Sequence, residues 1–341
     1  MKKMKKLLSL SVATIMALSL CACGSADPDK VDAGASTETG STGNTSDTVY
    51  NIGICQLVQH DALDAATQGF KDYLTEKLGD NVKFDEQNAQ GDSATCATIV
   101  NSFVSGDVDL ILANATAPLQ AASAATTSIP VLGTSVTDYA TALDISDWSG
   151  ATGTNVSGTS DLAPLKDQAA MLNELFPDAK NVGLVYCSAE PNSEYQVSVI
   201  TEELEGLGYT CTPYSFVDSN DIASVLQSAV SASDVLYVPT DNNAASNTEV
   251  INNIASEAGV PIIAGEAGIC KGCGVATLSI SYYELGYQTG KMAYEILVNG
   301  ADPSTMDVEF APSVTKQYNP DLCEKLGIKV PDNYEALDMT E

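Results

Sequence analysis

Two stretches decide the fold of this chain: residues 108–112 (VDLIL) and residues 129–133 (IPVLG). They have counterparts in the second half of the chain, at residues 233–237 (SDVLY) and 260–264 (VPIIA), about 125 to 131 residues further along. Short runs of this kind, rich in Val, Ile and Leu, are typical of buried strands in parallel sheets. The repeat therefore predicts two similar α/β units in one chain.

Around these stretches, apolar strands alternate with segments whose apolar residues follow helical spacing. In the first unit we expect strands at 50–55, 82–86, 108–113 and 129–133, and helices at 63–78, 93–105 and after Thr116; in the second, strands at 181–187, 209–216, 235–239 and 260–264, and helices at 193–207, 219–231 and 245–258. Such alternation predicts parallel sheets covered by helices on both faces, with right-handed crossovers. The predicted fold is α/β, with two doubly wound Rossmann-like lobes and a cleft between them.

The N-terminus indicates export. Four lysines within the first six residues precede an apolar run at 7–20, which is too short to cross a bilayer as a resident helix. Leu20-Cys21-Ala22-Cys23 then resembles a lipobox, in which Cys23 becomes the lipid-bearing first residue. We expect a signal peptide at 1–22 and a flexible, lipid-anchored tether at 23–48, rich in Ser, Thr, Gly and Asp. The alternative is an ordinary secreted protein with an unpaired cysteine.

Composition excludes several classes of function. The 341 residues carry a net charge of −30, which disfavours nucleic acid as a partner, and there is no arginine. The single histidine, His60, accompanies no catalytic motif, so we do not expect an enzyme or a cofactor. Cys270 and Cys273 form one CxxC pair without a second pair, which favours a local disulfide or free thiols over a metal or redox site.

Polar residues follow most of the predicted strands. In open α/β sheets ligands bind at the carboxyl ends of the strands, so these segments are candidate binding loops. Several of the residues, including Thr116 and Ser193, would also cap helices in a protein that bound nothing. Their placement in both units favours a ligand in the cleft.

Several motifs resemble those of ABC-type substrate-binding proteins of the tryptophan/tyrosine type. They are, in order, residues 54–70, with His60-Asp61-Ala62-Leu63-Asp64 and Gly69-Phe70, and residues 88–92, 115–118, 136–138, 155–158, 190–193, 238–242 and 283–286. The resemblance covers residues 49 to about 331. It implies a type I periplasmic-binding-protein fold, with lobes at 49–155 plus 282–312 and at 156–281 plus 313–341. It also implies a hinge of three crossovers, which we expect near residues 153–158, 278–281 and 311–314.

The resemblance further implies an extracytoplasmic, lipid-anchored and monomeric importer subunit. Its partners would be an ABC permease and an ATPase, and its solute would often be an aromatic amino acid. The ligand contacts carried over are Gln56, Thr116, Asp138, Glu190, Asn192, Ser193, Asp241 and Asn242, and Tyr139 is a further candidate. Tyr139 stands where the family usually has proline, and two roles are open to it: stacking on an aromatic ligand, or packing at the edge of the cleft.

Without arginine, an amino acid's carboxylate would lie on hydroxyls and helix N-terminal N–H groups near Thr116 and Ser193. Its ammonium would need an acid, for which Asp138, Glu190 and Asp241 are candidates. Tyr139, Trp148, Tyr186 or Tyr195 would line the side-chain pocket. Two alternatives remain: a surface sensor that touches a receptor, and an importer subunit for a nucleoside or sugar.

Overall fold

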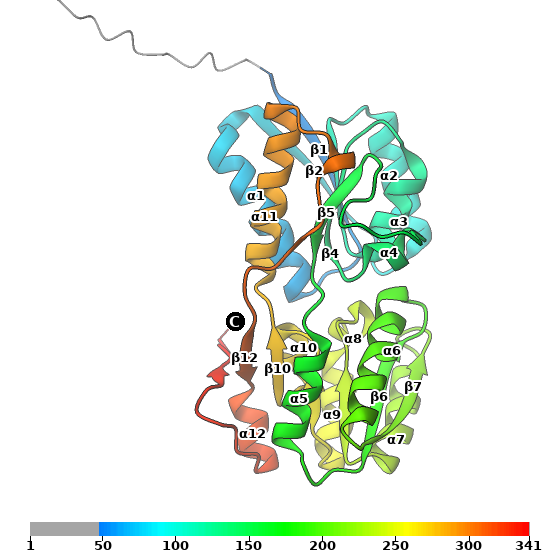
Figure 1. Cartoon of the computed structure of the whole chain (residues 1–341), viewed down its shortest axis with the longest axis vertical. Helices are drawn as coiled ribbons and strands as arrows, with labels where there is room; N and C mark the ends of the chain where they lie inside the picture. Colours follow the sequence, from blue (N-terminus) through cyan, green and yellow to red (C-terminus); the bar gives the residue numbers. More distant parts are fainter. Residues whose placement is uncertain (1–47, 341) are drawn as a thin grey trace, which may run out of the picture. The chain divides into compact units, whose positions relative to one another are not determined.

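The computed structural model describes residues 48–340, which form two parallel-sheet lobes (Figure 1). The expected signal peptide, the lipidation site Cys23 and the tether up to residue 47 lie outside the described residues. Within residues 48–340, no helix combines the length and apolarity needed to cross a membrane.

The first lobe contains a six-stranded sheet in the order β11-β5-β4-β3-β1-β2. Its elements are β1 (Tyr50–Gln56), α1 (Asp61–Leu78), η1 (Gly79–Asn81), β2 (Val82–Asn88), α2 (Ser93–Ser105), β3 (Leu110–Asn114), α3 (Thr116–Ala125), β4 (Val131–Val136), α4 (Tyr139–Ala142), β5 (Val156–Ser160), α11 (Tyr282–Asn299), η2 (Pro303–Thr305) and β11 (Glu309–Phe310). All pairings in this sheet are parallel.

The second lobe contains a seven-stranded sheet in the order β13-β12-β10-β9-β8-β6-β7. Its elements are α5 (Leu165–Leu175), β6 (Asn181–Cys187), α6 (Pro191–Gly206), β7 (Thr210–Phe216), α7 (Ile222–Ala232), β8 (Val235–Val238), α8 (Asn242–Ala245), α9 (Thr248–Ala258), β9 (Ile262–Ala264), α10 (Ala267–Gly272), β10 (Ala276–Ser279), β12 (Thr315–Tyr318), α12 (Pro320–Leu326) and β13 (Glu335–Ala336). Only the pairing of β12 with β10 is antiparallel. The predicted fold class is confirmed.

Burial explains why the central strands were recognisable from the sequence. Every residue of β3, β4 and β8 is buried, as expected for strands covered by helices on both faces. The edge strands β2 and β7 are largely exposed and carry mixed residues. The core of each lobe therefore lies on both faces of its central strands.

The chain passes between the lobes three times, at residues 161–164, 280–281 and 311–314. The first crossover differs from the expected one at 153–158, because β5 pairs with β4 and β11 and so belongs to the first sheet. The first lobe consequently extends to Ser160 rather than to residue 155. Five small or polar residues, VSGTS, form this strand, and only their pairing identifies it.

Helix α11 follows the second crossover and returns to the first lobe, where it lies beside α1 (Figure 1). The two backbones approach closely through small residues. A Cβ atom on Gly286 would overlap the backbone carbonyl of Ala66, and one on Gly69 would overlap that of Tyr283. Glycine at these positions therefore permits the packing of α1 against α11.

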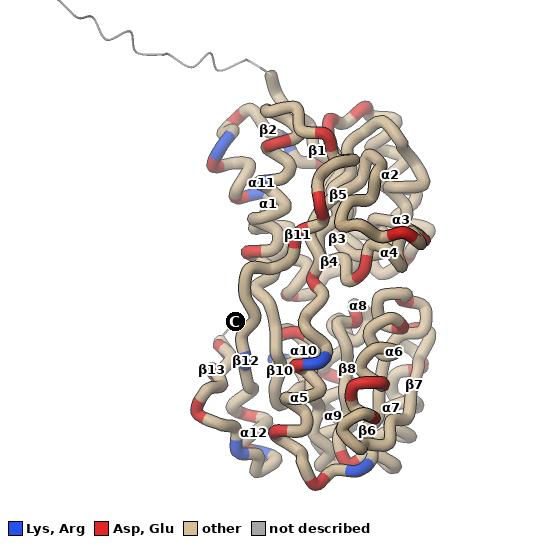
Figure 2. The backbone as a smooth tube through the Cα atoms, viewed as in Figure 1, with Lys and Arg blue, Asp and Glu red and all other residues tan. Residues whose placement is uncertain are grey.

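Acidic residues are scattered over both lobes with few lysines between them (Figure 2). The seven cysteines of the described region are all free, and six are buried. Cys270 and Cys273 make no disulfide; their thiols donate to the carbonyls of Gly274 and Ile269. The CxxC pair is thus a pair of free thiols in and beside the short helix α10.

Candidate cleft between the two sheets

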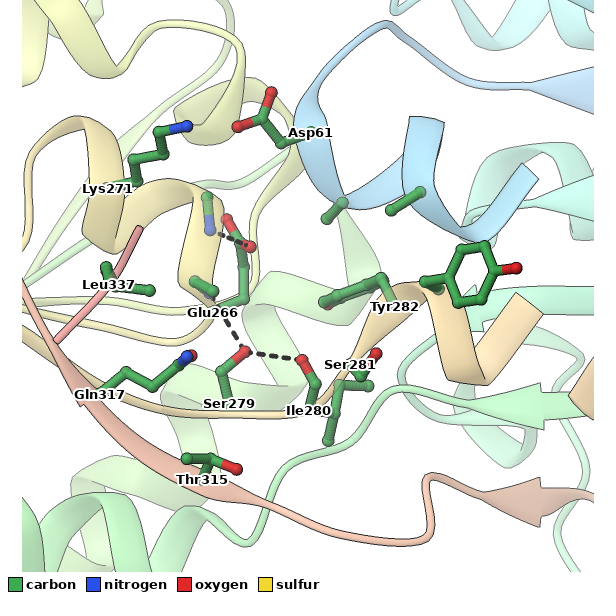
Figure 3. A pocket seen from close by; sticks show the side chains of 15 residues that line it. Asp61, Glu266, Lys271, Ser279, Ile280, Ser281, Tyr282, Thr315, Gln317 and Leu337 are labelled. Atoms are coloured by element: carbon green, nitrogen blue, oxygen red, sulfur yellow. Dashed lines mark hydrogen bonds between the residues drawn. The ribbon is translucent and has the colours of Figure 1, made fainter. Parts of the chain in front are cut away.

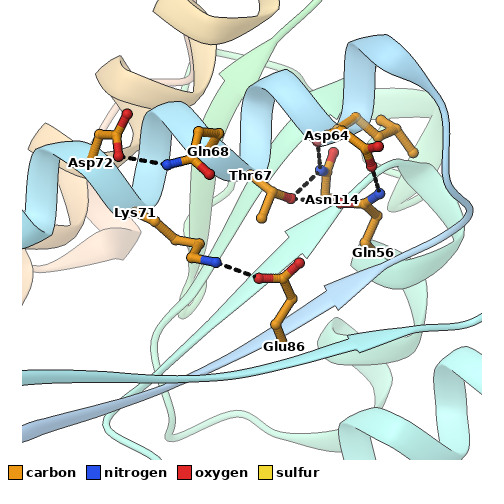
Figure 4. A network of polar contacts seen from close by, with 9 residues as sticks. Gln56, Asp64, Thr67, Gln68, Lys71, Asp72, Glu86 and Asn114 are labelled. Carbon is orange, nitrogen blue, oxygen red and sulfur yellow. Dashed lines mark hydrogen bonds and ion pairs between the residues drawn. The ribbon is translucent and has the colours of Figure 1, made fainter.

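The carboxyl ends of β1, β3 and β4 position the polar residues expected in the first lobe. Gln56, the last residue of β1, is buried: its amide nitrogen donates to Asp64 and to the Val58 carbonyl, and its amide oxygen accepts one bond, from Thr67 (Figure 4). Asn114, the last residue of β3, donates to Thr67 and to the Leu63 carbonyl. These bonds fix the start of α1 against the ends of the two strands.

Two strained residues lie at the same edge of the sheet. Ala115 has φ +100° just before Thr116 opens α3, and Ser135 has φ +55° at an irregularity within β4. Residues other than glycine rarely adopt these conformations, which cluster at ligand sites. The Ser135 hydroxyl and the Asn114 Oδ1 atom are also buried without a hydrogen-bond partner among the described residues. Unfilled polar atoms of this kind are typical of a site that a ligand completes.

Asn114 and Ser135 were not among the predicted contacts. Both lie in segments that the sequence marked as candidate loops, but nothing in the local pattern separates them from their polar neighbours. Their distinguishing features, a positive φ and an unpaired buried atom, are properties of the folded backbone. Thr116 is buried at the first position of α3, where it was expected.

Asp138 and Tyr139 have different environments although they are adjacent. Asp138 caps α4 by accepting from the Thr141 amide at 2.7 Å. Burial raises the pKa of Tyr195 in the second lobe, and the charge of Asp138 acts in the same direction. Tyr139 is only 2% exposed, and its hydroxyl donates to the Thr159 carbonyl.

The Tyr139 ring occupies space left by two glycines, because a Cβ atom on Gly133 or Gly158 would overlap its hydroxyl. Trp148, which is 38% exposed, stacks on the ring with centroids 6.4 Å apart. Tyr139 therefore packs within the core of the first lobe, which is the second of the two roles open to it.

In the second lobe the expected residues come together around Glu190. Its carboxylate accepts from the backbone N–H groups of Asn242 and Asn243 and from both of their side-chain amides, at 2.7 to 3.1 Å. Asn192 donates to it as well, at 3.2 Å. Glu190 thus closes the N-terminus of α8 and joins the ends of β6 and β8.

Asp241 lies beside this group and is almost completely buried. Its carboxylate accepts from the Cys187 amide at 2.6 Å and from the Ala244 amide at 2.8 Å. Burial raises the pKa of Asp241 to about 7, and the charge of Glu190 acts in the same direction, whereas the Ser193 hydroxyl and the two amides lower it. The five predicted residues of this lobe therefore form one hydrogen-bonded group.

The two lobes touch at His60 and Asn242. The His60 Nε2 atom lies 3.2 Å from Asn242 Oδ1. The Asn242 amide nitrogen is committed to Glu190, so Oδ1 accepts and His60 carries its proton on Nε2. Burial lowers the pKa of His60, which keeps the ring neutral at physiological pH.

A cavity of about 360 Å³ opens beside the second crossover, lined by Asp61 from α1 and by Glu266, Lys271 and Tyr282 (Figure 3). A second cavity, of about 430 Å³, shares Asp61, Glu266 and Lys271 and reaches His60. The Glu266 carboxylate accepts from the N–H groups of Gly268 and Ile269. Burial nevertheless raises its pKa to about 7.

The geometry suits recognition. Hydroxyls, amides and buried acids lie at the carboxyl ends of the strands of both sheets. The two cavities between the lobes are lined mainly by other residues, among them Asp61, Glu266 and Lys271. Within residues 48–340 no group of three metal-ligating side chains occurs. Such an arrangement can hold a small polar solute between the lobes.

Comparisons with known proteins agree with this geometry. Residues 51–338 match the model of the family described as ABC transporter substrate binding protein. The chain is 38% identical, over 87% of its length and 85% of the relative's, to a tyrosine-binding protein from Clostridioides difficile strain R20291.

Two solved structures are also similar. The ABC domain from Streptococcus pneumonia in complex with L-Trp is 31% identical, with a TM-score of 0.80 over 84% of this chain and 97% of that chain. The ligand-free, open structure of a substrate-binding protein with adhesive properties from Clostridium difficile is 38% identical. Its TM-score is 0.66, over 86% of this chain and 100% of that chain.

Proposed function

The chain belongs to the ABC transporter substrate-binding protein family, and we propose that it captures an aromatic amino acid between its two lobes for import. Proteins of this family bind solutes and are not enzymes. The observation that carries the proposal is the 38% identity to a tyrosine-binding protein along nearly the whole folded region. The L-Trp complex from Streptococcus pneumonia supports the same class of ligand.

The lobe arrangement supports a capture mechanism. The TM-score is higher with the L-Trp complex than with the ligand-free, open structure, although sequence identity is lower. The contact of His60 with Asn242 fits a state in which the lobes have approached each other. Ligand that touches both lobes would shift the population towards this state by bending at the three crossovers.

The proposed contacts with the solute are the polar residues at the carboxyl edges: Gln56, Thr116, Asp138, Asn192, Ser193 and Asn242, together with Asn114 and Ser135. The carboxylates of Glu190 and Asp241 already accept hydrogen bonds from backbone amides. We therefore assign them a structural role, in which they hold the loops at the carboxyl edge of the second sheet. Tyr139 supports the site from within the first lobe.

We further propose that Cys23 carries a lipid anchor, and that the protein delivers its solute as a monomer to an ABC permease and ATPase. Substrate-binding proteins of ABC importers act outside the cytoplasm, and the N-terminal sequence fits that location. Cys23→Ala should move the protein from the membrane fraction to the soluble fraction, and mass spectrometry should find lipid only on the unaltered chain. Equal membrane association of both would contradict the anchor.

The solute is tested by thermal shift of the purified full chain against the twenty amino acids, nucleosides and simple sugars. A ligand at 100 times its dissociation constant should stabilise the fold by about 2.7 kcal/mol. Shifts confined to Trp, Tyr or Phe would support the proposal. A shift only with a nucleoside or sugar would favour the alternative solute class, and binding without any permease partner would favour a surface sensor.

A further inference from the structure

Asp161 is the first residue after β5 and begins the first crossover between the lobes. Only 3% of it is exposed. One carboxylate oxygen, Oδ2, accepts from the Tyr282 hydroxyl at 2.8 Å. The other, Oδ1, has no hydrogen-bond partner among the described residues.

A buried carboxylate with an empty acceptor is costly, since it has lost water and gained one neutral partner. None of the ion pairs in the described region includes Asp161; they join Lys71 to Glu86, Lys77 to Glu76 and Lys316 to Glu174. Packing alone gives no reason for an acid here. A cation supplied from outside the chain would explain it.

The surroundings of Asp161 come from both lobes. Thr137 and Tyr139 face it from the first lobe, and Tyr282 faces it from the start of α11, just after the second crossover. The charge of Asp161 also raises the pKa of Glu266, the residue that caps α10 in the second lobe. Tyr282 in turn lies within reach of the Thr240 hydroxyl and lines the 360 Å³ cavity (Figure 3). Asp161 therefore lies where the carboxyl edges of the two sheets meet.

The other buried acids of the cleft, and Asp138, already accept hydrogen bonds. Glu190, Asp241 and Glu266 each accept at least two backbone N–H groups, and Asp138 caps α4. Asp161 alone among them combines near-complete burial with an oxygen that accepts nothing. An ammonium group would find its acceptor at this atom.

We infer that Asp161 binds the ammonium group of the amino-acid ligand through Oδ1, an inference that rests on the proposed function. Tyr282 holds the carboxylate in place through Oδ2 and is a positioning residue. The contact is specific for amino acids, because a sugar or an arylpropionate brings no positive charge to neutralise the buried acid.

The protonation of Asp161 supports this assignment. Burial raises its pKa, while the hydroxyls of Tyr282 and Thr137 lower it; the Thr137 hydroxyl does not reach hydrogen-bond geometry with Oδ1. An ammonium contact requires the ionised acid, so protonation competes with the ligand. Affinity for an amino acid should consequently fall as the pH is lowered.

The test uses calorimetry on the full chain with two probes: L-tyrosine and 3-(4-hydroxyphenyl)propionate, which lacks only the ammonium group. Asp161→Asn should weaken L-tyrosine binding about 10- to 100-fold, the loss expected for a charge-assisted hydrogen bond. Binding of the propionate should change less than about 3-fold, because it makes no such bond. Asp302→Asn, an exposed capping acid far from the cleft in sequence and fold, should change neither affinity.

Equal effects of Asp161→Asn on both probes would overturn the inference and leave the proposed function standing. Absence of amino-acid binding to the unaltered chain, with L-tryptophan and L-phenylalanine tried as well, would overturn both. If Asp161→Asn does not fold, the unaltered chain still decides the question. Its affinity for L-tyrosine should fall as the pH is lowered from 7 while its affinity for the propionate falls less, and parallel pH profiles would overturn the inference.

Discussion

Asp241 and Glu266 are buried acids whose carboxylates are used entirely within the second lobe. Both accept backbone N–H groups at the start of a short helix, yet the pKa of each is raised to about 7, since burial outweighs the hydrogen bonds. Their chemistry is therefore structural: each ties a strand end to the helix after it. Charge on either one costs the fold free energy in neutral solution.

The stability of the protein should consequently depend on pH in an unusual direction. Between about pH 5 and 7 the folded chain holds protons on Asp241 and Glu266 that the unfolded chain has released. Stability should fall as the pH rises through this window, by up to about 1.4 kcal/mol per pH unit for each group. Urea unfolding at pH 5, 6, 7 and 8 measures this.

Glu266→Gln should remove the share of that slope due to Glu266, because an amide does not titrate. A free energy of unfolding that rises with pH over this range would contradict the assignment. The same measurement on Asp302→Asn, where the acid is exposed, should reproduce the slope of the unaltered chain.

The packing of α1 against α11 is the element on which the first lobe depends most directly. Gly286→Ala would place a methyl group against the Ala66 carbonyl, which belongs to backbone and cannot move aside. We expect a loss of about 1–3 kcal/mol or more. Gly206→Ala is the matched control, since a Cβ atom there meets nothing within 4 Å and should cost little. Chemical denaturation of both variants measures the difference, and equal stabilities would show that the helices can separate.

The sequence predicted elements well where burial is continuous. The helix Ser93–Ser105 and the strand Asn181–Cys187 agree with the expectation residue for residue, because apolar periodicity and flanking polar residues mark both ends. Helices α5 and α11 and strand β10 were not predicted. Strand β5 was missed because its residues carry little apolar signal and owe their extended form to pairing with β4.

That omission also explains the missing site residue. Asp161 follows β5, so it was absent from the loops that follow recognised strands. The second-lobe group around Glu190 was found because β6 and β8 were recognised. The number of hydrogen bonds that each carboxylate accepts within the protein could not be predicted. Glu190, Asp241 and Asp161 all follow strands, and nothing in the sequence around them distinguishes their hydrogen bonding.

At the scale of the whole molecule, His60 and Asn242 provide a test of lobe approach. His60→Ala removes one hydrogen bond that exists only when the lobes are close, worth about 0.5–1.5 kcal/mol. Ligand affinity should fall about 2- to 10-fold, because the binding-competent state becomes less populated. Calorimetry measures the affinity, and thermal unfolding without ligand serves as the control. An unchanged affinity would show that the contact does not help to hold the lobes together.

Each lobe is built from separate stretches of the chain, which has a consequence for folding during synthesis. Helix α1 is made early, but its partner α11 emerges only after most of the second lobe, more than 200 residues later. Contacts so distant along the chain form slowly, because the entropy of closing a large loop is lost before the contacts stabilise the fold. During synthesis the first lobe therefore remains incomplete until α11 has emerged. A topology that delays its own completion suits a protein that must be threaded through a membrane before it folds.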